Sequence, residues 1–320
     1  MTGLSPRLRA VQWAEGLAPN VRGALWMLVS ALTYTAMTTL IKFLGDDYPA
    51  SLQTFYRQAA SMIVLAPMMI KDWRGTFRTS RPGILLFRSG AGVVAMTMGF
   101  YAVQKMPLAE ANALSFTRTL WLVPLAAFVL REKLGLLRIG ASLVGFGGVL
   151  LMLRPEAAGH SGFTIPQMAA LASAFLFALT ITGMKVMTRD HKTITLLAWA
   201  AVLGLVFALP PALLVWRWPS PMDLALLAAM GVLGVVTQAC YIKGMQIGDA
   251  GAMAPIDYTR LVFAVLFGFA FFHDIPSLVT MVGAAVVVGS TLIITWHEQW
   301  EAKKAKSKAA AEASAAALEA

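Results

Sequence analysis

The sequence predicts an all-α integral membrane protein: ten transmembrane helices in two inverted five-helix repeats, with both termini in the cytoplasm. Three observations support this fold class. First, 58% of the 320 residues are hydrophobic and 13% are charged, whereas soluble domains carry about 25% charged residues. Second, the chain contains ten continuous apolar runs, each close to the ~20 residues that a spanning helix needs. Third, a Thr-Arg pair recurs near the middle of the fourth and ninth runs.

The apolar runs cover most of the chain and leave almost no soluble domain. They lie at about residues 22–41, 52–70, 83–104, 108–130, 135–153, 166–187, 193–216, 222–244, 251–272 and 276–296. Continuous apolarity excludes the alternating strands of a membrane barrel. The single cysteine, Cys240, excludes an internal disulfide. No apolar signal core precedes Asn20, so a cleaved signal peptide is not expected.

The distribution of basic residues orients the predicted spans. With the N-terminus inside, 18 Lys and Arg residues lie on the cytoplasmic side and four on the outer side, while the other four of the 26 lie within spans. By the positive-inside rule, the two terminal segments, residues 1–21 and 298–320, are predicted to be cytoplasmic. This topology accounts for the net charge of +10, so no nucleic-acid partner is expected.

Polar residues mark one face of two predicted spans in the first half. The first span carries Ser30, Tyr34 and Thr38 at four-residue intervals, which places them on one side of a helix. The third span ends with Thr97 and Tyr101, one turn apart. Such a polar face lines a cavity or contacts another helix.

Other features of the first half are explained by topology and packing. Arg57 lies about two turns into the second span and Arg88 near the start of the third, so both are expected to be shallow and to extend toward the membrane surface. The fifth span is rich in glycine, which lets helices approach closely. Its glycines are Gly140, Gly145, Gly147 and Gly148.

An internal repeat divides the spans five and five, with residues 22–155 as the first copy, 156–165 as a linker and 166–297 as the second copy. Matched positions lie 139 to 143 residues apart. They are Lys42 with Lys185, Thr97-Tyr101 with Thr237-Tyr241, Glu110 with Asp249, Thr117-Arg118 with Thr259-Arg260, and Arg131-Glu132 with His273-Asp274. A unit with an odd number of crossings returns inverted, and inverted repeats are typical of transporters with a binding site near the bilayer midplane.

The arginines of the repeated pair, Arg118 and Arg260, are candidate functional residues. A charge at the middle of a span costs about 2.5–3.5 kcal/mol on insertion scales, which suggests a function. Arg118 is predicted to bind a substrate carboxylate or phosphate. The structural alternative is that it pairs with helix-end carbonyls or stacks on Trp121.

Arg260 has a nearby partner in Asp257, three residues earlier on the same face. The two charges would neutralise each other; alternatively Asp257, the only deep carboxylate, is a site of proton coupling. Other candidates for the substrate pathway are polar or amphipathic groups that a cavity or a helix contact would equally satisfy. They are Asn112, Gln238, Tyr34, Tyr101, Tyr241, Tyr258 and Trp121.

An ordered set of short motifs carries a resemblance to a known family. The motifs are Phe55-Tyr56-Arg57, the stretch from Arg81 to Arg88, Pro107-Leu108-Ala109, Glu132, and the run from Gly145 to Val149 before Pro155. Over about residues 22–296 the chain resembles the drug/metabolite transporter superfamily in its EamA-type, ten-span form. The second copy has His273-Asp274 where the first has Arg131-Glu132, so no glutamate role is transferred to that position.

This resemblance implies a multi-pass carrier of the bacterial inner membrane that works by alternating access without ATP. Its implied substrate is a small polar metabolite, such as an amino acid or a related anionic or zwitterionic compound, with export favoured. A central cavity would be walled by spans 1, 3, 4, 6, 8 and 9. The expected partners are the substrate and the lipid bilayer. A homodimer is left open, and neither a cofactor nor a metal is expected.

Two competing functions are considered. A lipid or lipid-linked-sugar carrier would need a lateral opening, which the sequence does not show. An intramembrane enzyme is disfavoured because aspartyl proteolysis needs two carboxylates that share a proton, and only Asp257 is deep. The four histidines lie at span ends or in loops, without the spacing of metal ligands.

Overall fold

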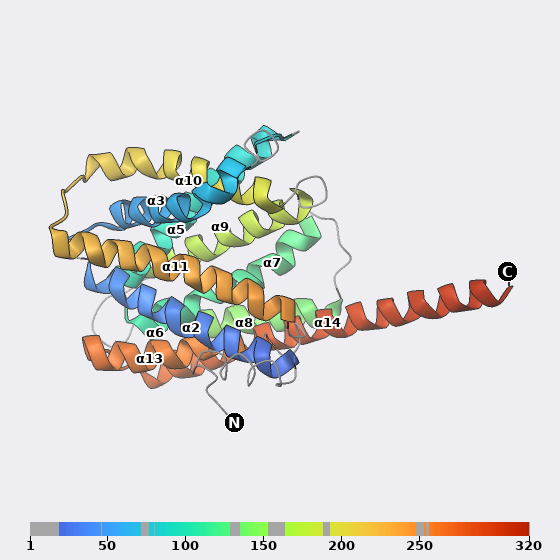
Figure 1. Cartoon of the computed structure of the whole chain (residues 1–320). Coiled ribbons are helices and arrows are strands. Elements are labelled where there is room, and N and C mark those ends of the chain that lie inside the picture. The colour runs from blue at the N-terminus through green and yellow to red at the C-terminus, as the bar shows by residue number, and fades with distance from the viewer. Residues whose placement is uncertain are drawn as a thin grey trace, which may run out of the picture.

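The computed structural model describes residues 19–45, 47–71, 77–79, 81–128, 135–152, 164–187, 193–247, 253 and 256–319. All regular elements in these ranges are helices, and they form one bundle (Figure 1). The first half contains α2 (Pro19–Phe43), α3 (Ala50–Lys71), α5 (Pro82–Lys105), α6 (Leu108–Ser115), α7 (Thr117–Phe128) and α8 (Leu136–Met152). The second half contains α9 (Ile165–Met187), α10 (Thr193–Leu214), α11 (Pro221–Ile247), α13 (Thr259–Phe272) and α14 (Leu278–Glu319).

The helices have the length and composition of membrane spans. Within the described ranges, six are long and apolar enough to cross a bilayer: α2, α5, α9, α10, α11 and α14. Shorter apolar helices include α13 and most of α8. Large apolar side chains such as Leu143, Phe128 and Phe271 are exposed on the outside of the bundle, where lipid would cover them. The protein is therefore an integral membrane protein of helical type.

The fourth and ninth apolar runs were predicted as continuous spans, and both helices are interrupted at the Thr-Arg pair. Phe116 separates α6 from α7, and Tyr258 precedes α13. At both positions the threonine hydroxyl donates to the carbonyl three residues back, Thr117 to Leu114 and Thr259 to Ile256, at 2.7 Å each. Such side-chain bonds compete with the regular helix ladder. The two interruptions are therefore alike in chemistry as well as in sequence.

The strongest helix packing follows a symmetric pattern. Among the described residues, the most extensive contacts pair α2 with α11, α5 with α9, α3 with α10, and α8 with α14. The set is unchanged when every predicted span is replaced by the span five places away. The pair α2–α11 becomes α9–α5, and the pairs α3–α10 and α8–α14 become themselves. Two polar contacts obey the same exchange: Ser30 donates to the Thr237 carbonyl at 2.9 Å, and Ser173 donates to the Ala95 carbonyl at 2.6 Å.

Glycines allow α8 and α14 to pack at close range. A Cβ added at Gly148 would lie 2.9 Å from the Gly283 carbonyl oxygen, and one added at Gly283 would lie 2.7 Å from the Gly148 oxygen. Gly145 is equally tight against Leu120, at 2.7 Å. Gly140 and Gly147, by contrast, face open space. Only part of the predicted glycine run therefore serves helix packing.

Several polar contacts join loops and helix ends at one end of the bundle. Lys42, at the end of α2, forms an ion pair with Asp274, which follows α13. The Asp274 carboxylate also accepts from the Leu108 backbone N–H at 3.4 Å. Arg217 lies 3.3 Å from Asp47. Helix α2 ends and helix α14 begins at this end of the bundle. The start of α2 and the point where α14 leaves the bundle both lie at the opposite end (Figure 1).

The predicted terminal and linking segments are described only in part. Residues 1–18 of the N-terminal segment and 153–163 around the linker lie outside the described residues. So do Glu132 and Asp249 of the matched pairs. The tail from residue 298 to 319 continues α14 as helix and projects beyond the bundle (Figure 1).

Candidate functional site

A cavity of about 210 Å³ lies between the two halves of the bundle. Its described lining comes from α2, α3, α5, α6, α7, α9 and α11. The lining residues are Tyr34, Met37, Thr38, Arg57, Met96, Gly99, Phe100, Ala102, Val103, Ala111, Asn112, Ser115, Arg118, Ala170, Ser173, Ala174, Phe177 and Gln238. Apolar walls with a few polar groups are typical of sites for small molecules. The cavity is the candidate substrate site.

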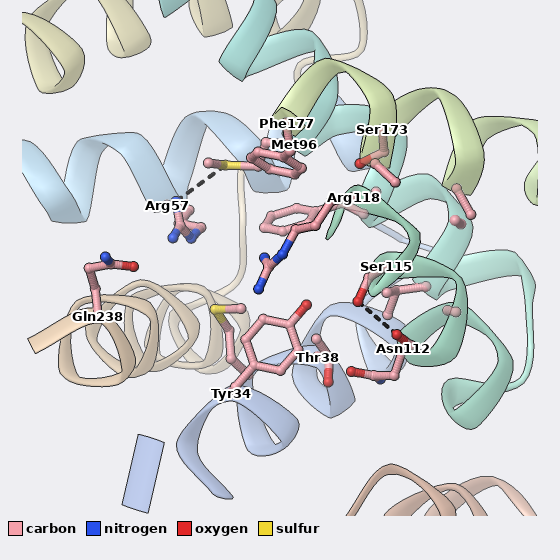
Figure 2. A pocket seen from close by; sticks show the side chains of 18 residues that line it. Tyr34, Thr38, Arg57, Met96, Asn112, Ser115, Arg118, Ser173, Phe177 and Gln238 are labelled. Atoms are coloured by element: carbon pink, nitrogen blue, oxygen red, sulfur yellow. Dashed lines mark hydrogen bonds between the residues drawn. The ribbon is translucent and has the colours of Figure 1, made fainter. Parts of the chain in front are cut away.

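Arg118 projects from α7 into this cavity (Figure 2). Its side chain is 33% exposed, and its Nη2 lies 3.9 Å from Asp257 Oδ2. Trp121, the predicted alternative partner, instead packs edge-on against Phe146 and Phe175, with ring centroids 4.8 and 5.1 Å away. Arg118 therefore retains accessible donors that face the cavity.

Arg260, the matching arginine, is held beside the cavity rather than in its lining. Its side chain is 8% exposed, and its Nη2 donates to Asp257 Oδ2 at 2.6 Å. The guanidinium lies over the rings of Tyr34 and Phe116, 4.8 and 4.9 Å from their centroids. These contacts are those of a structural cation enclosed by an ion pair and two aromatic faces.

Asp257 and Tyr258, in the second half of the chain, contact residues of the first half beside Arg260. Asp257, on the other side of the interruption at Tyr258, links Arg260 of α13 to Arg118 of α7. The Tyr258 ring packs on Phe116 with centroids 4.6 Å apart, and its hydroxyl donates to Thr291. Neither Asp257 nor Tyr258 lines the cavity, but Asp257 lies within ion-pair distance of Arg118, which does.

The other predicted pathway residues divide between the cavity and helix packing. Tyr34, Asn112 and Gln238 line the cavity. The Asn112 amide also donates to the Leu108 carbonyl at 2.8 Å, so only part of its hydrogen-bonding capacity faces the cavity. Tyr101 packs against the core, and neither Tyr101 nor Tyr241 is among the described lining residues.

Arg57 was predicted to extend toward the membrane surface, and that prediction is wrong. Its side chain turns inward to the cavity, where its Nη1 donates to Met96 Sδ at 3.3 Å (Figure 2). Space for it comes from Gly234 on α11, where an added Cβ would lie 3.0 Å from the Arg57 Nε. The second span therefore contributes to the cavity, whereas the ninth, expected as a wall, supplies none of the described lining residues.

Two further features bear on the alternatives. Among the described residues, no three His, Cys, Asp or Glu side chains are close enough to hold a metal ion. A second, apolar groove between α5 and α10 is lined by residues such as Val94, Phe207 and Pro211. It shares no described lining residue with the central cavity, so it gives no support to a lateral opening for lipid.

The sequence and fold match known transporters. The profile of the EamA-like transporter family matches residues 21–154 and 164–296. A Rickettsia bellii S-adenosylmethionine uptake transporter is 30% identical over 89% of this chain and 96% of its own. A Vibrio cholerae riboflavin transporter is 27% identical over the same shares. Mouse solute carrier family 35 member G1 is 27% identical over 84% of this chain and 77% of its own.

A solved crystal structure shares the fold, with a TM-score of 0.58 and 20% identity over 85% of this chain and 95% of the other. The family and the relatives are all described as transporters or solute carriers, not as enzymes. The resemblance to EamA-type carriers of the drug/metabolite transporter superfamily is confirmed. The chain belongs to the EamA-like transporter family.

Proposed function

We propose that this protein is a secondary transporter of the bacterial inner membrane that moves a small metabolite with a carboxylate or phosphate group. The observation that carries this proposal is Arg118, a cation in the lining of a central cavity with accessible donors. A guanidinium binds carboxylate or phosphate through two parallel hydrogen bonds. In a membrane interior such a side chain is retained for binding or for a structural pair.

The proposed mechanism is alternating access by two inverted repeats of five spans each. Three observations support the repeat: the family profile matches twice, helix contacts are preserved when spans five apart are exchanged, and the two Thr-Arg interruptions have equivalent hydrogen bonds. In inverted repeats each half can adopt the conformation of the other, which opens the site to either side. Together with the six described helices long and apolar enough to cross a bilayer, α3, α8, α13 and the interrupted pair α6–α7 make up the proposed ten spans.

One end of the bundle is tied by the Lys42–Asp274 pair and the Asp274–Leu108 hydrogen bond. With both termini proposed to be cytoplasmic, this is the outer end. The contact joins the first span to the loop after the ninth, and so crosses between the halves. Opening the cavity to the outside would require this pair to separate.

Asp257 is the proposed proton-coupling residue. Its carboxylate lies between Arg260 and Arg118, so neutralising it would release its hold on the cavity arginine. While Asp257 is charged, its carboxylate and a substrate anion would compete for the Arg118 guanidinium. This arrangement links a proton at Asp257 to binding at Arg118.

The names of the relatives bear on substrate and direction. S-adenosylmethionine, carried by the Rickettsia protein, is an amino acid whose carboxylate would suit Arg118. The riboflavin transporter shows a different substrate at similar identity, so identity at this level does not select one compound. Export was expected from the resemblance, whereas the Rickettsia relative works in uptake. Direction therefore has to be measured.

Metabolite profiling of cells and medium tests the proposal. Bacterial cells that produce the wild-type protein are compared with cells that produce Arg118→Gln at equal membrane levels and with cells that produce neither. We expect one anionic or zwitterionic metabolite to change its distribution only with the wild type, because the variant loses the binding cation. Arg88→Gln, which removes a span arginine outside the described cavity lining, is the matched control and should behave as wild type.

An equal change with Arg118→Gln would contradict the proposed role of this arginine. The sign of the change gives the direction: depletion from the medium means uptake, and accumulation in the medium means export.

A further inference from the structure

The central cavity has more positive than negative charge around it. Arg57 and Arg118 both line it, and none of its described lining residues is acidic. The carboxylate of Asp257 lies 2.6 Å from Arg260 and 3.9 Å from Arg118. Three guanidinium groups, those of Arg57, Arg118 and Arg260, are thus accompanied by one described carboxylate. The excess is two positive charges.

Arg57 has only neutral partners among the described side chains. Its Nη1 lies 3.3 Å from Met96 Sδ and 3.5 Å from Gln58 Oε1. Its Nε is buried without a hydrogen-bond partner in the described part of the chain. A guanidinium has five N–H donors, and a cation removed from water without a counter-charge costs free energy. An anion that enters the cavity would remove this cost.

The bundle holds the Arg57 side chain at the cavity. An arginine two turns into a span can extend to the membrane surface, but Arg57 contacts Met96 of α5 instead. On the other side, α11 passes so close that an added Cβ at Gly234 would lie 3.0 Å from Nε. Arg118 enters the same cavity from α7, so the two cations come from separate helices (Figure 2).

We infer that the substrate carries two negative charges, one met by Arg118 and the other by Arg57. This inference rests on the proposed function and narrows its substrate class to dianions, either dicarboxylates or phosphate monoesters. Two cations without an acidic neighbour in the described lining would repel a sulfonium or an ammonium group. S-adenosylmethionine contains both groups, and riboflavin carries no negative charge at neutral pH. The substrate of this chain therefore differs in charge from those named for the relatives.

Ligand capture by the purified full-length protein tests this inference. The probe is a defined mixture of succinate, malate and glycerol 3-phosphate, the monoamides of the two dicarboxylates, alanine, S-adenosylmethionine and riboflavin. Retained compounds are identified by mass spectrometry, and their affinities are measured one at a time. The variants are Arg57→Gln, Arg57→Lys, Arg118→Gln and the control Arg88→Gln.

The expected result is that dianions are retained in preference to their singly charged analogues. Arg57→Gln should weaken dianion binding by at least about tenfold, while monoanion binding changes by less than about threefold, because only the second charge loses its partner. Arg57→Lys should restore part of the preference, and Arg88→Gln should leave it intact. Whether dicarboxylates or phosphate esters are retained decides between the two sources of charge.

Three results would overturn the inference. They are retention of S-adenosylmethionine or riboflavin in place of the dianions, retention of no dianion, and an unchanged preference in Arg57→Gln. If only monoanions bind, in a manner that depends on Arg118 but not on Arg57, the dianion inference fails and the proposed function stands. If Arg118→Gln binds every compound as wild type does, the proposed function itself fails.

Discussion

Arg118 and Arg260 share a sequence motif and occupy similar helix interruptions, but their surroundings differ. Arg260 is enclosed by Asp257, Tyr34 and Phe116, whereas Arg118 faces the cavity. The order of charges along the chain predicted part of this difference, because Asp257 lies one turn before Arg260. The approach of Asp257 to Arg118 could not be predicted, since it depends on how the two halves pack.

Substitution of Asp257 tests its proposed part in proton coupling. In proteoliposomes, Asp257→Asn should lose accumulation of the profiled metabolite driven by a pH gradient, because the carboxylate proposed to couple transport to protons is gone. Exchange of the same metabolite without a gradient should persist, since Arg118 remains. The variant should also be less stable, by about 3–5 kcal/mol, because Arg260 loses its carboxylate in a buried position. Thermal unfolding in detergent measures that loss.

Full accumulation driven by a pH gradient in Asp257→Asn would remove this residue from coupling. Loss of both exchange and accumulation in a protein that is still folded would instead assign it to binding.

The candidate site shows what sequence patterns reveal about single residues. The polar face predicted for the first span was useful, because Tyr34 and Thr38 do line the cavity. The position of Arg57 along its span led to a wrong prediction of where its side chain points, because the direction of a long side chain depends on its neighbours. The neighbour here is Gly234, on a helix distant in the sequence. The sequence around a glycine on one span and an arginine on another does not indicate that the two residues are in contact.

At the scale of helices, the apolar runs predicted the positions of the helices well but did not predict the interruptions. Described helices coincide with all ten runs. The fourth and ninth runs contain Phe116 and Tyr258 at the interruptions, and neither residue is a helix breaker. The bonds that mark these positions come from Thr117 and Thr259, and threonine is also common inside regular helices. Local propensity therefore could not identify the interruptions.

Packing between α8 and α14 supplies a prediction at this scale. Gly148→Ala should destabilise the protein by about 1–3 kcal/mol, the usual cost of overpacking, because its Cβ would lie 2.9 Å from the Gly283 carbonyl oxygen and from Val286. Gly147→Ala, on the adjacent residue with open space around it, is the matched control. Thermal unfolding in detergent should show a lower Tm for Gly148→Ala only.

Equal Tm values for the two variants would show that α8 and α14 do not pack through Gly148. A drop with Gly147→Ala alone would place the opposite face of α8 in the contact.

At the scale of the whole molecule, the proposed repeat was predicted in the sequence from a few matched residues. The helix contacts of the described residues agree with it, since exchanging spans five apart preserves the main packing pairs. The sequence did not predict which ends of the halves touch. That depends on the conformation adopted, here one in which Lys42 and Asp274 pair.

The inverted topology underlies the proposed mechanism, because alternating access by two inverted repeats depends on it. Single cysteines placed in a Cys240→Ala background test it directly. Asp47→Cys and Ser220→Cys should react with an impermeant maleimide in intact cells, since both lie at the proposed outer end. Thr79→Cys and Lys304→Cys should react only after lysis. Labelling of Lys304→Cys in intact cells, or protection of Asp47→Cys and Ser220→Cys, would contradict the proposed topology.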